Sequence, residues 1–267
     1  QEGDIVRRID SDQAQAASTL KFEDPEQSRV AFTDRSMLLE RLGVDVNFGI
    51  VADQTADTAS FIYPRALGTT AEGAAARVAA AVEGERGHVL STLKHFPGHG
   101  AMPGDSHSSI PQSALTLDEW LTGHAVPFRA GIDAGAEMVM LGHLLFPAID
   151  SEPASLSAVW NGILRDQLGF DGIIITDDMR MLQDSGNPDY SDAALNAVAA
   201  LRAGATMLLY VLPTNPQAIG ADPDRIIDTI TEAVLGGTIE ESTIDDAALR
   251  LLTVRRELSG ETSAWHK

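Results

Sequence analysis

The chain alternates short apolar runs with longer segments of helical periodicity. The apolar runs are rich in Val, Ile, Leu and Met without clean polar alternation, which is typical of strands covered on both faces of a parallel sheet. Five strands are predicted on this basis, over residues 44–51, 88–93, 138–141, 172–176 and 206–212. Because strands that alternate with helices form βαβ units, the pattern predicts an α/β fold.

Helix start and stop signals lie between these strands. Asp24 and Thr116 stand where N-caps are expected, and Gly135, Gly169 and Gly204 stand near expected helix ends. Seven helices are predicted, over residues 25–42, 71–85, 117–134, 157–168, 191–203, 224–235 and 244–258. Helix and strand therefore alternate along most of the chain.

Length and strand count define the architecture that we expect. A chain of 267 residues suits a single α/β barrel. We therefore predict one catalytic domain over residues 1–267, a TIM-type (β/α) barrel. A closed barrel needs about eight strands, and only five are found. The N-terminal strands of the barrel are accordingly expected to be missing from this chain.

Composition narrows the classes of partner. The formal net charge of −20 disfavours nucleic acid and anionic membranes, both of which attract basic surfaces. No apolar run is long enough to predict a membrane span. The absence of cysteine excludes disulfides, a thiol nucleophile and a Cys-based zinc site.

Two of the predicted strands end abruptly in ionisable residues. The apolar run at 172–176 leads into Asp177 and Asp178, and the run at 88–93 leads into Lys94 and His95. An α/β barrel builds its active site at these C-terminal strand ends. Asp177 is therefore a candidate nucleophile, general base or metal ligand. The alternative is an N-cap of the next helix, and two adjacent acids can divide these roles.

The loop over residues 97–111 carries a second candidate group. It is rich in Gly, Pro and Ser and contains Asp105 and His107. A carboxylate two residues from a histidine can fix the imidazole tautomer and raise its basicity, which suits acid–base catalysis. The alternative is a solvated loop histidine. The polar loop is typical of an active-site lid more than of a plain connection.

Further polar residues stand near other strand ends. Lys94 and His95 can donate hydrogen bonds to the hydroxyl groups of a ligand, although a buried histidine and a paired lysine are the alternative. Asp53 follows the strand at 44–51, and Arg8 and Arg65 lie in loops. Each of these three, taken alone, is more typical of a surface charge.

Known motifs for other chemistries are missing from the sequence. There is no glycine-rich nucleotide loop, no Walker-type loop and no nucleophile elbow. No pair of histidines has helical metal-ligand spacing, and a Pro/Gly-rich loop is a poor frame for a metal, so neither a metal nor a cofactor is expected. The constellation suits an uncharged, polyhydroxylated ligand such as a sugar.

Two motifs in order carry a family resemblance. Lys-His-Phe-Pro-Gly-His-Gly at 94–100 with Asp-Ser-His at 105–107, and Gly-Phe-Asp-Gly-Ile-Ile-Ile-Thr-Asp-Asp-Met at 169–179, closely resemble glycoside hydrolase family 3. The Asp-Ser-His element resembles the NagZ-type β-N-acetylhexosaminidases of that family. The resemblance runs from Gln1 to about Leu212. The opening Gln1-Glu2-Gly3-Asp4 matches only part of the family's Asp-x-Glu-Gly-Gly motif.

The resemblance implies a retaining exo-β-N-acetylglucosaminidase acting on cell-wall (muropeptide) or chitin-derived glycans. Asp177 would be the nucleophile and His107 the acid/base, with Asp105 as its partner. The substrate-binding residues implied are Arg8, Asp53, Arg65, Lys94 and His95. The alternatives are a β-glucosidase, a β-GlcNAc phosphorylase or a non-catalytic sugar-binding protein.

Partners and location follow from the same resemblance. We expect a small carbohydrate containing N-acetylglucosamine as substrate, and a monomer that binds no nucleic acid. The Asp-Ser-His loop and the Met-Leu-Gly-His-Leu stretch at 140–144 look most like actinobacterial envelope members of the family. We therefore expect the cell envelope or the outside of the cell in preference to the cytoplasm.

Overall fold

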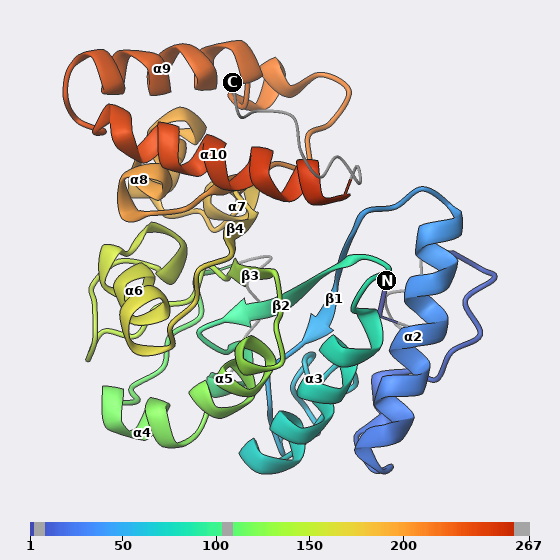
Figure 1. The fold of residues 1–267 in the computed structure, drawn as a ribbon. Helices are drawn as coiled ribbons and strands as arrows, with labels where there is room; N and C mark the ends of the chain where they lie inside the picture. The colour runs from blue at the N-terminus through green and yellow to red at the C-terminus, as the bar shows by residue number, and fades with distance from the viewer. Residues whose placement is uncertain (3–8, 103–108, 259–267) are drawn as a thin grey trace.

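The computed structural model describes residues 1–2, 9–102 and 109–258, and their centre is a five-stranded parallel sheet (Figure 1). The strands are β1 (Val46–Val51), β2 (Leu90–Phe96), β3 (Met138–Leu141), β4 (Ile173–Asp178) and β5 (Met207–Leu209). They pair in sequence order, each parallel to the next. The α/β class and all five predicted strands are confirmed. In the described part of the chain the sheet is open, with β1 and β5 at its edges.

Ten α-helices accompany the sheet in the described residues. They are α1 (Ala17–Leu20), α2 (Pro25–Arg41), α3 (Ala71–Glu85), α4 (Leu117–Thr122), α5 (Ala125–Asp133), α6 (Ala158–Gly162), α7 (Arg180–Asp184), α8 (Ala193–Ala203), α9 (Pro223–Leu235) and α10 (Glu241–Leu258). Caps explain several starts: the side chains of Asp24 and Thr70 accept hydrogen bonds from backbone N–H groups in the first turns of α2 and α3.

Two predicted helices are divided in the structure. The segment predicted over 117–134 forms α4 and α5, because Gly123 leaves the helical conformation at φ −121° and ψ −90°. The segment predicted over 157–168 forms α6 followed by a π-helical turn at Ile163–Gln167, closed by a 3.0 Å bond from Leu168 N to Ile163 O. Apolar periodicity continues through both breaks, so it did not reveal them.

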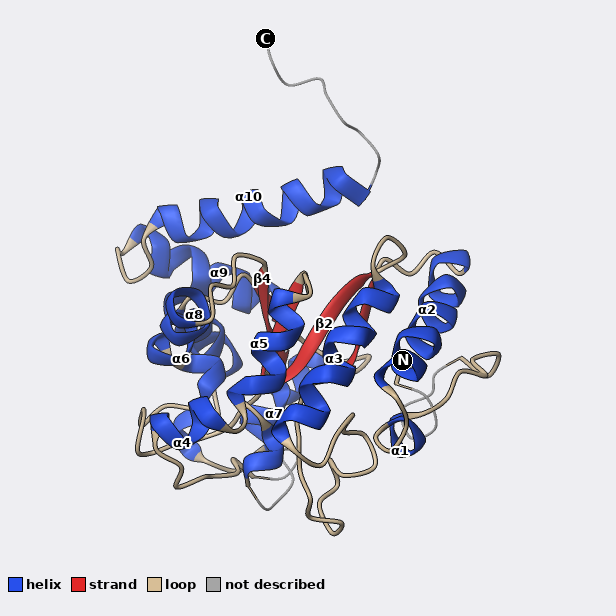
Figure 2. Cartoon of the chain, turned by 60° about the horizontal axis from the view of Figure 1, so that its bottom comes forward, coloured by secondary structure: helices blue, strands red, loops and turns tan. Residues whose placement is uncertain are grey.

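The two faces of the sheet are packed differently (Figures 1 and 2). On one face, Ile50, Leu93 and Val139 of the strands pack in one cluster with helix residues. The helix residues include Phe32 of α2 and Phe128 of α5. This is the main core, with aromatic rings at its centre. The opposite face presents a second apolar cluster from all five strands, which packs against α10.

Strand periodicity assigns the polar strand ends to the second face. Ile173 and Ile175 belong to that face, so Asp177, two residues further along β4, also belongs to it. Leu90 belongs to it as well, and Lys94 follows at the same parity in β2. The fold therefore brings a carboxylate and an ammonium group to one face at one end of the sheet.

Candidate active site

The predicted site residues gather at the C-terminal edge of the sheet. The register pairs Val51 with Lys94, and Leu141 with Thr176. In a parallel sheet these pairs define one edge, so the residues that follow them share that edge. Asp53, Lys94, His143 and Asp177 therefore lie at one rim of the sheet.

Asp177 is held at this rim as an ionised carboxylate. Its Oδ1 accepts a 2.8 Å hydrogen bond from the backbone N–H of Asp178. Burial alone would raise the pKa of Asp177, but the nearby imidazole of His95, this hydrogen bond and the Lys94 ammonium hold it below its usual value. A carboxylate that is ionised at neutral pH is available as a nucleophile or base.

Asp178 has a different, structural role. Its Oδ1 accepts hydrogen bonds from the backbone N–H of Arg180 at 3.2 Å and of Val211 at 3.0 Å. The side chain thereby ties the end of β4 to the start of α7 and to the segment after β5. The two adjacent acids therefore have different roles, as the sequence allows. Asp178 binds backbone N–H groups, and Asp177 faces the site.

His143 is buried against the end of β4. Its Nε2 lies 2.9 Å from the backbone carbonyl oxygen of Asp178, and its Nδ1 lies 2.7 Å from the hydroxyl of Ser155. Because a carbonyl oxygen only accepts, Nε2 carries the proton and Nδ1 accepts from Ser155. Burial lowers the pKa of His143, so the ring is neutral. His143 therefore supports the strand end that carries Asp177.

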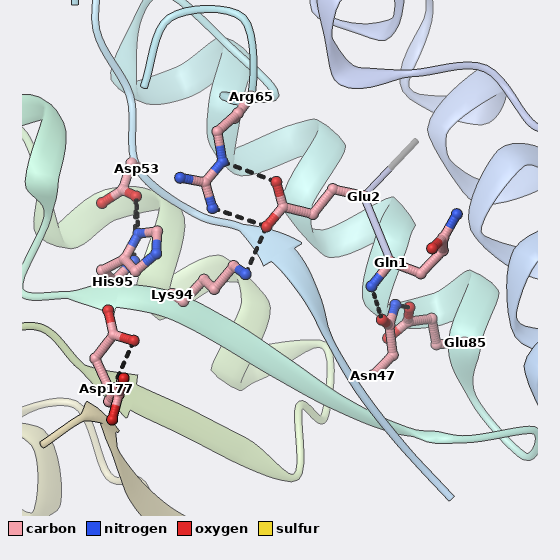
Figure 3. Close-up of polar contacts among 10 residues, drawn as sticks. Gln1, Glu2, Asn47, Asp53, Arg65, Glu85, Lys94, His95 and Asp177 are labelled. Atoms are coloured by element: carbon pink, nitrogen blue, oxygen red, sulfur yellow. Dashed lines mark hydrogen bonds and ion pairs between the residues drawn. The ribbon is translucent and has the colours of Figure 1, made fainter. Parts of the chain in front are cut away.

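Asp53 and His95 form a buried pair (Figure 3). Oδ2 of Asp53 accepts hydrogen bonds from the backbone N–H of His95 at 3.2 Å and from its Nδ1 at 2.7 Å. Oδ1 of Asp53 accepts from the backbone N–H of His99. Burial would raise the pKa of Asp53, but these partners lower it overall. Asp53 thus orients the His95 ring, and direct contact of Asp53 with a ligand stays a prediction.

A third cluster joins two predicted binding residues to a carboxylate that we did not predict. Arg65 donates to Glu2 through Nε and Nη2, both at 2.8 Å, and Nζ of Lys94 lies 2.5 Å from Oε1 of Glu2 (Figure 3). Burial would raise the pKa of Glu2, but Arg65 and Lys94 lower it to about 2. The signal that leads to such a residue is the burial of two cations at one rim, because buried cations need a carboxylate.

Three predicted residues cannot be placed. Arg8, Asp105 and His107 lie outside the residues that the structure describes, so their roles stay predictions. Within the described ranges, no three His, Asp or Glu side chains are grouped to hold a metal ion. None of the described helices is long and apolar enough to cross a membrane.

Comparison with known proteins assigns the chain to a family. A profile of the glycosyl hydrolase family 3 N-terminal domain matches residues 16–254. The chain belongs to this family. The resemblance read from the two motifs is thereby confirmed, and the match extends beyond Leu212 into the C-terminal part of the chain.

Individual relatives agree with this assignment. A β-hexosaminidase of Chromobacterium violaceum is 40% identical over 173 residues, which cover 64% of this chain and 48% of that protein. The structure of a family 3 β-N-acetylglucosaminidase from Paenibacillus has a TM-score of 0.87 at 30% identity, covering all of this chain and 51% of the other. LpqI of M. tuberculosis has a TM-score of 0.82 at 30% identity, covering 93% of this chain and 73% of the other. The chain thus spans about half the length of the curated relatives that it matches.

Proposed function

We propose that this protein is a retaining exo-β-N-acetylglucosaminidase that removes terminal N-acetylglucosamine from cell-wall (muropeptide) or chitin-derived glycans. The observation that carries the proposal is the ionised Asp177 at the sheet rim, on the same edge as Lys94 and His95. The names of the relatives, β-hexosaminidase and β-N-acetylglucosaminidase, support the choice of sugar.

The proposed reaction has two displacements. In the first, a carboxylate oxygen of Asp177 attacks the anomeric carbon while protonated His107 donates its proton to the leaving glycosidic oxygen. In the second, neutral His107 takes a proton from water, whose oxygen attacks the anomeric carbon and releases Asp177. A neutral imidazole is not repelled by the carboxylate nucleophile. Asp105 would hold His107 in the required tautomer.

Sugar binding is assigned to the cationic side of the rim. The side chains of Lys94, His95 and Arg65 would hydrogen-bond to hydroxyl groups at the non-reducing end, with Arg8 as a further contact. Asp53 fixes the His95 ring through the 2.7 Å contact, which supports a defined orientation for that hydrogen bond. Rigidly held donors of this kind favour one substrate orientation over others.

We also propose that residues 1–267 act as one (β/α) barrel domain. The second apolar face, to which all five strands contribute, supports this, because a barrel needs an interior filled by side chains. The pairing of five strands in sequence order fits a continuous segment of such a wall.

The direct test compares 4-nitrophenyl β-N-acetylglucosaminide with 4-nitrophenyl β-glucoside. The proposal predicts turnover of the first and little of the second, with the same rate in the presence and absence of phosphate. Preference for the glucoside would assign a β-glucosidase. A phosphate requirement with release of sugar 1-phosphate would assign a phosphorylase. Binding of N-acetylglucosamine without turnover would assign a sugar-binding protein.

A further inference from the structure

Glu2 is a buried carboxylate placed between two cations. Its side chain is 4% exposed, and those of Arg65 and Lys94 are 12% and 9% exposed. Arg65 makes a two-pronged contact with Glu2, and Lys94 contacts the same Oε1 atom. Paired contacts of this geometry hold all three side chains in place.

The charged groups around this cluster carry a slight negative excess. The carboxylates that act on Arg65 are Glu2, Asp53 and Asp177. Among the described residues at this rim, they face two permanent cations, Arg65 and Lys94. The two cations remain useful to a ligand, because Nη1 of Arg65 and further N–H groups of Lys94 are not used in the contacts with Glu2. They can donate hydrogen bonds while their charge is already compensated.

We propose that Glu2 is a specificity-determining residue that makes this end of the site select uncharged sugar groups and reject anionic ones. The inference rests on the proposed function, because it concerns the sugar end of the same site. A neutral hydroxyl accepts from Lys94 and Arg65 with Glu2 in place. A phosphate or carboxylate group would have to approach next to the negative charge of Glu2, which is the repulsive element that specificity requires.

The alternative is that Glu2 only supports the packing of the rim. Both readings predict some loss when Glu2 is replaced, so loss alone does not separate them. They differ in the predicted affinity of the variant for an anion. If Glu2 sets the charge, its neutralisation removes the negative excess and leaves two cations facing two carboxylates, so an anion should then bind better than before. A packing role predicts no such gain.

The test is calorimetric binding of N-acetylglucosamine and of inorganic phosphate at constant ionic strength. The variant Glu2→Gln removes the charge with little change of shape. We expect the wild-type protein to bind the sugar and to bind phosphate weakly. We expect Glu2→Gln to bind phosphate at least about tenfold more tightly, in line with removal of one charge beside a partly buried cation pair, and to bind the sugar more weakly.

Two controls define the origin of the gain. Glu232→Gln makes the same change of net charge on the exposed surface of α9 and should leave both affinities unchanged. The double variant Glu2→Gln, Lys94→Met removes one charge of each sign and should lose the gain in phosphate affinity. Glu2→Asp, which keeps the charge but withdraws it from one of its partners, should show a smaller gain and serves if Glu2→Gln does not fold.

The outcomes separate this inference from the proposed function. Equal phosphate affinity in folded Glu2→Gln and in the wild type, with sugar binding intact in the wild type, overturns the specificity role and leaves the proposed function standing. A wild-type protein that neither binds N-acetylglucosamine nor hydrolyses its aryl glycoside overturns the proposed function and this assignment with it. A phosphate gain confined to the Glu2 variants, with sugar binding in the wild type, supports both.

Discussion

Nε2 of His143 lies 2.9 Å from the backbone carbonyl oxygen of Asp178, the residue directly after Asp177. The contact is local in space but joins the end of β3 to the end of β4. It places a neutral, buried ring against the strand end that carries the proposed nucleophile. Ser155 completes the chain by donating to Nδ1 of the same ring. The position of Asp177 therefore depends on two residues that the substrate need not touch.

The first prediction concerns this support. Ser155→Ala leaves a buried imidazole nitrogen without a donor, which should lower the free energy of unfolding by about 1–2 kcal/mol. The looser ring should also lower kcat on an aryl β-N-acetylglucosaminide, with little change in KM. Urea unfolding and steady-state kinetics measure the two effects. The exposed Ser151→Ala serves as the matched control. Equal kcat in the two variants would mean that His143 does not position Asp177.

The second prediction concerns the Asp53–His95 pair. Asp53→Asn keeps the size of the side chain but removes the charge that holds Nδ1 of His95. The imidazole should lose its fixed orientation, and KM for the aryl glycoside should rise about tenfold or more. Direct binding of N-acetylglucosamine should weaken by a similar factor. Unchanged sugar affinity in a folded variant would remove His95 from the sugar contacts.

The third prediction is a pH dependence of stability. Glu85 is fully buried, and burial raises its pKa to about 8, against a usual 4.5, despite a hydrogen bond from Asn47. The folded protein therefore keeps a proton that the unfolded chain releases, so Glu85 costs stability progressively as pH rises from about 4.5 to about 8. Below pH 4.5 both states are protonated and the cost disappears.

The variant Glu85→Gln tests this directly. A neutral amide retains an oxygen that accepts from Asn47 and has no proton to lose. Its free energy of unfolding, relative to wild type, should therefore increase between pH 5 and pH 8 by more than about 1 kcal/mol. Denaturant unfolding at the two pH values measures the difference. A stability difference that does not change with pH would show that Glu85 is ionised in the folded protein.

The sequence was sufficient for those features that local pattern controls. Residues 71–85 were predicted as a helix and form α3 with the same bounds, because Thr70 caps an alanine-rich segment. Asp177 stood out because a carboxylate that follows three buried isoleucines and Thr176 is conspicuous at a strand end. All five strands were predicted because each is a short apolar run that stands out from the helical segments around it.

Long-range pairing set the limits of sequence-based prediction. Glu2 lies 63 positions from Arg65 in the sequence, so no local pattern joins them. The break at Gly123 was missed because apolar spacing continues across it, and a single glycine is tolerated in many helices. The tie from Asp178 to Val211 likewise depends on the pairing of β4 and β5, which only the folded sheet defines.

The fourth prediction concerns His107 as the acid/base. A poor alkoxide leaving group needs a proton in the first step, whereas a dinitrophenolate hardly needs one. His107→Ala should therefore lose far more glycosylation activity on a disaccharide of N-acetylglucosamine than on the dinitrophenyl glycoside. Azide should restore the second step, because it attacks without a base. Equal single-turnover losses on both substrates, with no azide rescue, would remove His107 from this role.

The central claim is that Asp177 forms the covalent bond to the sugar. The most direct measurement is mass spectrometry of peptides after reaction with an activated 5-fluoro derivative of N-acetylglucosamine, which slows release of the intermediate. We predict one added glycosyl group on Asp177, its absence in Asp177→Ala, and its retention in folded Asp178→Asn. A label on Asp178, or on a residue outside this rim, would contradict the account.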